Sequence, residues 1–156
     1  PISDLKIILG KFLAGLFLIG LCLLPTLIYY YTVYQLGSPK GNLDSGGIMG
    51  SYVGLVFLSA CFLAIGIFSS ALSSNQVVAF IIGAFLCFLC QWFFLYVSKL
   101  PVFVGSLDYF IQKIGMDYHY GRMSKGVIDL KDVIYFLSVI TLFIGFTHFV
   151  LQKRKW

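Results

Sequence analysis

Long uninterrupted apolar stretches dominate the hydropathy pattern of this chain. Four of them carry no charged side chain: Phe12–Tyr34, Ile48–Ser69, Val77–Val97 and Val133–Leu151. Each has about 19–23 residues and would form a helix roughly 29–35 Å long, close to the ~30 Å hydrocarbon core of a bilayer. Because none has the polar face that a helix in water requires, the pattern predicts an all-α, polytopic transmembrane bundle with four spans.

The long segment between the third and fourth stretches has a helical period of its own. Its apolar residues recur at i, i+3, i+4 and i+7: Leu107, Phe110, Ile111 and Ile114. We therefore expect a short amphipathic helix in this outer loop, with Ser106 capping its start. Asp129 and Asp132 stand at the start of the last span, where both would act as helix caps.

Small and polar residues interrupt the apolar pattern at a few places. Gly46, Gly50 and Gly54 are spaced four apart, which gives one helix face a flat stripe and predicts close packing against another helix. That helix could belong to this chain or to a second subunit. Gln91 is the strongly polar residue of the third span; it predicts an inter-helix hydrogen bond, with a transport role as the alternative.

Two further features of the spans have more than one interpretation. Pro25 lies inside the first span and should kink it, as fixed shape or as a hinge. Cys87 and Cys90 could form a metal or redox pair, although two small packing residues are the more common meaning inside a membrane helix.

Composition agrees with a membrane protein. The chain is 60% hydrophobic and 11% charged, whereas a soluble domain has about 25% charged residues. The net charge of +5 does not indicate nucleic-acid binding, because the basic residues lie at span ends and form no single stripe. Lys6 and Lys11 precede the first span and Lys153–Lys155 follow the last, so their density predicts that both termini are cytoplasmic.

No motif for bond chemistry stands out. The chain has no phosphate-binding Gly-x4-Gly-Lys-Ser/Thr loop and no convincing metal-ligand spacing. His119 falls in an outer loop and His148 near the inner end of the last span, so they do not suit a haem ligand pair. The sequence thus predicts no enzyme activity and no cofactor.

Three segments together resemble the permease subunits of ABC-2-type transporters: Pro1–Ala14, Gly50–Gly54 continuing through Ala64–Phe80, and Gly126–Phe136. Within that family the chain is most similar to the gliding-motility permease of Bacteroidota (GldF type). The resemblance covers nearly the whole chain. It implies a six-span permease of the bacterial inner membrane, of which this chain holds the last four spans, with the first two spans and the coupling helix upstream of Pro1.

The resemblance also implies partners and site residues. The partners would be an ATP-binding cassette ATPase subunit, a second permease copy or a sister permease, and membrane lipid, and the process would be export linked to gliding. The polar turn between the second and third spans would lie at the inner mouth as a candidate gate: Ser69, Ser70, Asn75 and Gln76. Gln91 would line the dimer cavity. The alternative function is a membrane anchor or cofactor-holding subunit without transport.

Overall fold

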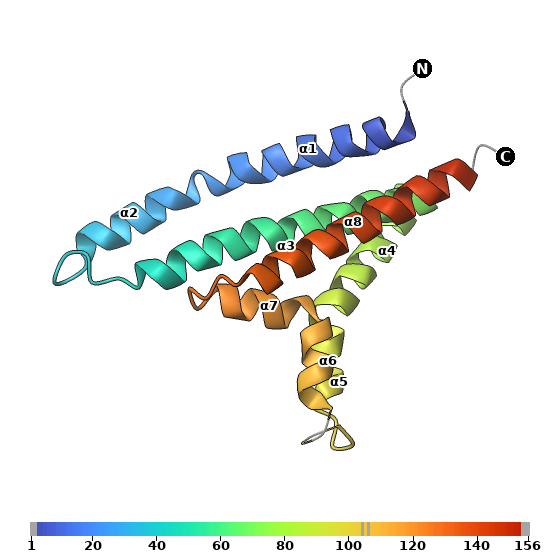
Figure 1. The fold of residues 1–156 in the computed structure, drawn as a ribbon. Helices are drawn as coiled ribbons and strands as arrows, with labels where there is room; N and C mark the ends of the chain where they lie inside the picture. The colour runs from blue at the N-terminus through green and yellow to red at the C-terminus, as the bar shows by residue number, and fades with distance from the viewer. Residues whose placement is uncertain (1–2, 104, 106, 154–156) are drawn as a thin grey trace.

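The computed structural model describes residues 3–103, 105 and 107–153, and these residues form helices and connecting turns without a β-strand. Figure 1 shows the helices in chain order. They are α1 (Asp4–Leu23), α2 (Thr26–Leu36), α3 (Ser45–Leu72), α4 (Gln76–Phe88), the π-helical turn η1 (Leu89–Phe93), α5 (Phe94–Ser98), α6 (Asp108–Ile114), α7 (Met116–Met123) and α8 (Leu130–Lys153).

The four predicted spans are confirmed as four helical stretches long and apolar enough to cross a membrane. They are Asp4–Leu36, Ser45–Leu72, Gln76–Ser98 and Leu130–Lys153. Each begins and ends outside the predicted apolar run, because the helix continues into residues that flank the run. At the start of α3, for example, the Asp44 carboxylate accepts a hydrogen bond from the Gly47 amide at 3.0 Å.

The first span is interrupted at Pro25, as its position predicts. α1 ends at Leu23 and α2 begins at Thr26, since proline offers no amide hydrogen to the helix. The Thr26 hydroxyl donates to the Leu23 carbonyl at 2.6 Å and lies 2.8 Å from the Tyr52 hydroxyl on α3. The break is therefore tied to its neighbouring helix.

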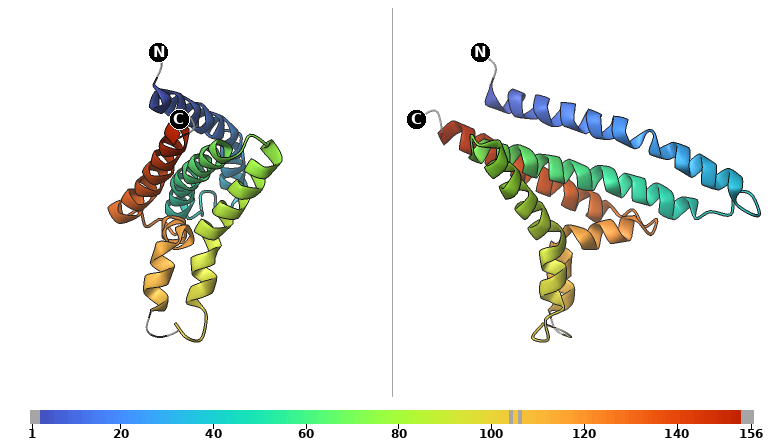
Figure 2. Two further views of the ribbon diagram at one scale, coloured as in Figure 1. Left: turned by 90° about the vertical axis from the view of Figure 1, so that its right-hand side faces the viewer. Right: turned by 180° about the vertical axis from the view of Figure 1, so that it is seen from behind.

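α3 is the central helix, and it packs against α1, α4, α7 and α8 (Figures 1 and 2). Cys61, Ile65 and Phe136 are fully buried where α3 meets α8, and Ile8 of α1 and Met116 and Met123 of α7 are also buried. The Phe57 ring of α3 stacks on the Phe136 ring at 6.0 Å between centroids. Most other long apolar side chains face outward, as they do in a protein whose solvent is lipid.

The third span is not straight. α4 runs beside α3, but after η1 the chain turns away, and α5 and α6 lie side by side as a hairpin that projects from the bundle (Figures 1 and 2). A π-helical turn shifts the register of the backbone hydrogen bonds and is a common place for such a deviation. The predicted amphipathic helix is confirmed as α6, in which Phe110 is 65% exposed while Ile111 is half-buried. The expected cap, Ser106, lies outside the described residues.

The bundle has two distinct ends. Asp4, Leu72, Gln76 and Lys153, where helices begin or end, lie at one of them, which we call the terminal end (Figure 1). The α7 end is the opposite one, where α2 ends, α3 and α8 begin, and α7 packs along α3 and α8.

Candidate functional site

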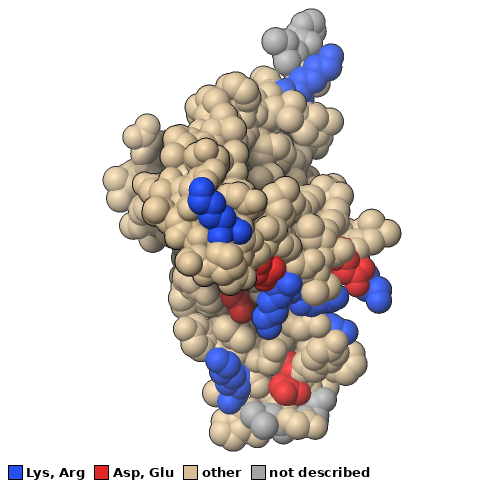
Figure 3. All heavy atoms as spheres, turned by 90° about the vertical axis from the view of Figure 1, so that its left-hand side faces the viewer, with Lys and Arg blue, Asp and Glu red and all other residues tan. Residues whose placement is uncertain are grey.

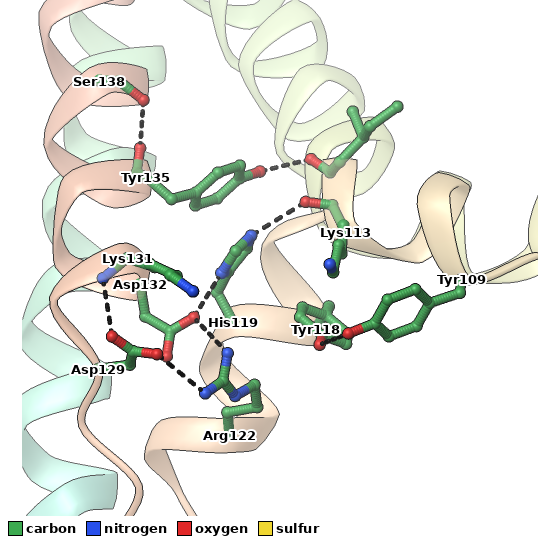
Figure 4. Close-up of polar contacts among 11 residues, drawn as sticks. Tyr109, Lys113, Tyr118, His119, Arg122, Asp129, Lys131, Asp132, Tyr135 and Ser138 are labelled. Carbon is green, nitrogen blue, oxygen red and sulfur yellow. Dashed lines mark hydrogen bonds and ion pairs between the residues drawn. The ribbon is translucent and has the colours of Figure 1, made fainter.

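The densest group of polar side chains lies at the α7 end, between α7 and the start of α8 (Figure 4). We call it the polar cluster; it consists of His119, Arg122, Asp129, Asp132 and Tyr135. Figure 3 views the molecule from this end and shows acidic and basic side chains close together within a wide uncharged surface. Ionisable groups near membrane depth are costly to bury, so such a group is the first candidate for a functional site.

Local structure places these side chains opposite one another. His119 and Arg122 are three residues apart in α7, and Asp129 and Asp132 are three apart at the start of α8, so each pair shares a helix face. A short turn joins the helices, and in it Gly126 has a φ of +81°, a conformation that favours glycine. The turn brings the basic pair against the acidic pair.

His119 is the centre of the cluster. Its Nδ1 lies 2.6 Å from Asp132 Oδ1, and its Nε2 lies 2.9 Å from the Lys113 carbonyl oxygen. A carbonyl only accepts, so Nε2 must carry a hydrogen. The contact with Asp132 then holds a second hydrogen, on Nδ1 or on the carboxyl group. Both side chains are buried, His119 at 8% exposure and Asp132 at 0%.

Arg122 adds a positive charge beside the two carboxylates. Its Nη2 donates to Asp129 Oδ2 at 3.3 Å, and its Nη1 lies 3.6 Å from Asp132 Oδ1. The Asp132 charge is the main cause that raises the pKa of Arg122 above its usual value. Arg122 therefore stays cationic and joins the two acidic residues.

Asp129 and Asp132 have different structural roles. Asp129 Oδ1 accepts from the Lys131 amide at 3.2 Å, which confirms its role as a cap. This hydrogen bond, followed by the one from Arg122, holds the pKa of Asp129 below its usual value. The prediction that Asp132 also caps α8 is wrong: Asp132 is paired with His119, and its Oδ2 has no hydrogen-bond partner among the described residues.

Tyr135 closes the cluster on the bundle side. Its ring stacks on the His119 imidazole with the centroids 3.9 Å apart, and its hydroxyl donates to the Ile114 carbonyl. The ring covers one face of His119 in the His119–Asp132 pair, and the hydroxyl connects α8 to the end of α6. One cluster thus joins α6, α7 and α8.

The predicted glycine stripe packs against the same region. A Cβ on Gly50 would collide with the Met123 carbonyl oxygen, and one on Gly54 would lie 3.1 Å from Tyr120 and Met123 side-chain atoms. Gly46 is exposed, and its backbone faces Gly126. The helix that approaches Gly50 and Gly54 is therefore α7 of the same chain.

The candidate gate residues lie at the terminal end. Ser69 is buried at 3% exposure and donates to the Gly66 carbonyl of its own helix at 2.9 Å. Asn75 accepts from the Val77 amide at 2.9 Å and so caps α4. Ser70 and Gln76 are exposed, and with Ser69 they line a groove of about 420 Å³ between α3 and α4. The structure thus brings three of the four predicted residues to one groove.

Gln91 occupies the π-helical turn η1 and is buried at 7% exposure. Its Oε1 has no hydrogen-bond partner among the described residues, so the predicted inter-helix bond is not made by this atom. Gln91 lines an apolar cavity of about 260 Å³ between α3 and α4, together with Leu58, Phe62 and Trp92. Cys87 and Cys90 are free and pack against the core nearby.

The polar cluster contains a hydrogen-bonded histidine and carboxylate but no nucleophile in line with them. Within residues 3–103, 105 and 107–153, no three His, Cys, Asp or Glu side chains lie close enough together to hold a metal ion. The arrangement can hold a proton between two buried groups and fix three helices. The polar cluster thus connects α6, α7 and α8 through ionisable side chains within an otherwise apolar protein.

Comparison with known proteins adds no assignment. No family model, no curated protein and no solved structure matches the chain. What the fold itself defines is a helical membrane protein with four spans.

Sequence reasoning placed His119 in a loop and missed its partner. The signal was present, because His119-x-x-Arg122 and Asp129-x-x-Asp132 place basic residue types and acidic residue types at the same spacing on consecutive segments. Gly83 was also missed: a Cβ there would lie 2.7 Å from Ser69 Oγ, so this glycine sets the approach of α4 to α3. An isolated glycine in an apolar run gives no comparable signal.

Proposed function

We propose that this chain is the transmembrane permease subunit of an ATP-driven transporter of the ABC-2 type. It would lie in the bacterial inner membrane with its terminal end facing the cytoplasm, and its activity would be export linked to gliding motility. ATP hydrolysis would belong to a separate ATP-binding cassette subunit, and a second permease copy or a sister permease would complete the pathway.

The observation that carries the proposal is the difference between the two ends of the bundle. At the α7 end, the His119–Asp132 pair and the close approach of Gly50 to Met123 hold helices together. At the terminal end, one groove lies beside α3 toward α1 and α8 and another toward α4, although Ile8 and Ser69 remain buried between the helices there. Such an arrangement suits a subunit that an ATPase moves from one side while the other side stays fixed.

The candidate gate fits this geometry. Ser70 and Gln76 line the groove between α3 and α4 at the terminal end. Their hydroxyl and amide groups could bind water or polar substrate groups where the helices separate. Gln91, with its unpaired Oε1, would supply a polar contact further along the same helix pair.

Co-purification tests the proposal. The tagged protein is solubilised from its own cells in mild detergent, and the proteins that elute with it are identified by mass spectrometry. We expect an ATPase with Walker motifs in near-stoichiometric amount, with ATP hydrolysis in the eluate. A tagged, unrelated four-span protein purified alongside is the control.

The opposite result would favour the alternative function. Elution without an ATPase, together with a haem absorption band or a bound quinone, would identify a cofactor-holding subunit. Elution without an ATPase and without a chromophore would identify a membrane anchor. Either outcome overturns the permease proposal.

A further inference from the structure

A groove at the terminal end combines an apolar floor with a positive charge. It has a volume of about 280 Å³ and lies among α1, α3 and α8. The residues that define it include Ile7, Lys11, Leu63, Ile67, Ser70 and Leu151. This volume is just below the range of small-molecule pockets, about 300–1,000 Å³, so it suits one hydrocarbon chain better than a bulky ligand.

The charge around the groove is positive. Lys11 lines it, and Lys6 and Lys153 belong to the same end of the bundle. Asp4 is the acidic residue of α1, about two turns before Lys11. The other five acidic residues lie near the α7 end or in α6 and α7: Asp44, Asp108, Asp117, Asp129 and Asp132.

The depth of the charged and polar groups matches a membrane interface. Ser70 and Leu151 are each two residues from the end of their helix, α3 and α8 respectively. Lys11 lies seven residues into α1, roughly 10 Å along the axis. A lysine at that depth extends its ammonium group toward the headgroup layer while its methylene chain stays in apolar surroundings.

We propose that this groove binds an anionic phospholipid of the leaflet in which the terminal end lies. The lipid phosphate contacts the Lys11 ammonium, and the Ser70 hydroxyl donates to a headgroup oxygen. One acyl chain lies on Ile7, Leu63 and Ile67 between α1 and α3. The lipid thus fills the space where α1, α3 and α8 do not touch.

Native mass spectrometry of the purified protein tests this binding. The protein is incubated in detergent with phosphatidylglycerol or with phosphatidylcholine of the same acyl chains, and bound lipids are counted. We expect one retained phosphatidylglycerol and little phosphatidylcholine. Lys11→Gln should lower phosphatidylglycerol retention about fivefold, as expected for loss of one cation near an anionic headgroup.

Two matched controls separate the groove from general attraction. Lys6→Gln removes the same charge from the same helix, but Lys6 does not line the groove, so retention should not change. Gly66 also lines the groove, and an added Cβ there meets no atom within 4 Å, so Gly66→Leu should fill the groove and reduce retention. Gly10→Leu, also unobstructed, should leave retention unchanged.

Several results would overturn the proposal. Equal losses in Lys11→Gln and Lys6→Gln would mean diffuse attraction to the surface. Equal retention of the two lipids would mean that the headgroup charge is not recognised. Displacement of the lipid by millimolar inorganic phosphate would mean that the site takes a phosphate ion without an acyl chain. Retention unaffected by Gly66→Leu would place the lipid elsewhere.

Discussion

At the α7 end, side chains of α7 and α8 bond to one another, whereas at the terminal end the buried hydroxyls of Ser69 and Thr147 bond within their own helices. His119 of α7 pairs with Asp132 of α8, and Tyr135 of α8 donates to the end of α6. By contrast, Ser69 bonds to Gly66 within α3, and Thr147 bonds to Phe143 within α8. Both ends carry polar side chains, so the difference lies in the partners to which these side chains bond.

Packing follows the same division. α7 approaches α3 so closely that Gly50 has no room for a Cβ, while Gly66, sixteen residues later in the same helix, meets nothing within 4 Å. α3 is therefore closed by α7 around Gly50 and open around Gly66, although α4 still approaches it closely where Gly83 meets Ser69. In lipid, where apolar surface gives helices little reason to associate, close backbone approach and polar pairing decide which contacts persist.

Removing the carboxylate of the polar cluster should have the largest effect. Asp132→Ala leaves the buried His119 Nδ1 without its hydrogen-bond partner and removes the carboxyl group beside Arg122. Loss of one partner from a buried pair costs about 3–5 kcal/mol, so the free energy of unfolding in detergent should fall by that amount. Asp108→Asn, outside the cluster, is the control; an equal loss in both variants would contradict the role of the pair.

A matched pair of glycine substitutions should separate the two faces of α3. Gly50→Leu must displace Met123 and Gly126, and overpacking of this kind costs about 1–3 kcal/mol. Gly66→Leu should be neutral or slightly stabilising, because leucine is the better helix former. Thermal unfolding of both variants measures the difference. The contrast between the two ends fails if the two substitutions are tolerated equally.

A smaller effect is expected for the tyrosine hydroxyl that joins α8 to α6. Tyr135→Phe keeps the ring on His119 but removes the hydrogen bond to the Ile114 carbonyl. The expected cost is about 0.5–1.5 kcal/mol, measured by the same unfolding assay. Tyr31→Phe, at an exposed position of α2, should cost nothing measurable; a cost equal to that of Tyr135→Phe would argue against this link.

The smallest expected effect is a fall in the free energy of unfolding at low pH. The Lys131 amide and Arg122 lower the pKa of Asp129 in the folded protein. Its contribution to stability is therefore present above the usual aspartate pKa and is lost as the pH falls through the lower, folded value. Between pH 6 and pH 3, the wild type should lose more stability than Asp129→Asn. Parallel curves would show that Asp129 does not contribute.

Much of this fold could be predicted because each membrane span is a long, continuous run of apolar residues. The four apolar runs, the break at Pro25 and the short helix at Phe110 all follow from local sequence. The polar cluster could not be predicted from local sequence, because it depends on how α7 packs against the start of α8. Asp132 also satisfies the local rule for a helix cap, and only its burial beside His119 shows the stronger interaction.

The π-helical turn η1 was likewise not predicted by the sequence pattern. The run Val77–Val97 predicts one span, interrupted only by the polar Gln91, and the structure places a π-helical turn within it at Leu89–Phe93. Neither proline nor glycine marks that position. At the bend, α7 lies against η1 and α6 lies against α5, so the turn coincides with contacts that the local sequence does not encode.

The proposed contrast between a fixed α7 end and a movable terminal end is tested most directly by two spin-label distances. One runs from α3 to α8 at the α7 end, and the other from α4 to α8 at the terminal end. In a variant with the four native cysteines replaced by alanine, labels at Met49 and Leu130 report on the α7 end. Labels at Gln76 and Gln152 report on the terminal end; all four positions are exposed. In lipid nanodiscs, we expect a narrow distance distribution for the first pair and a broader one for the second. Equal widths, or a broader distribution at Met49 and Leu130, would contradict the account.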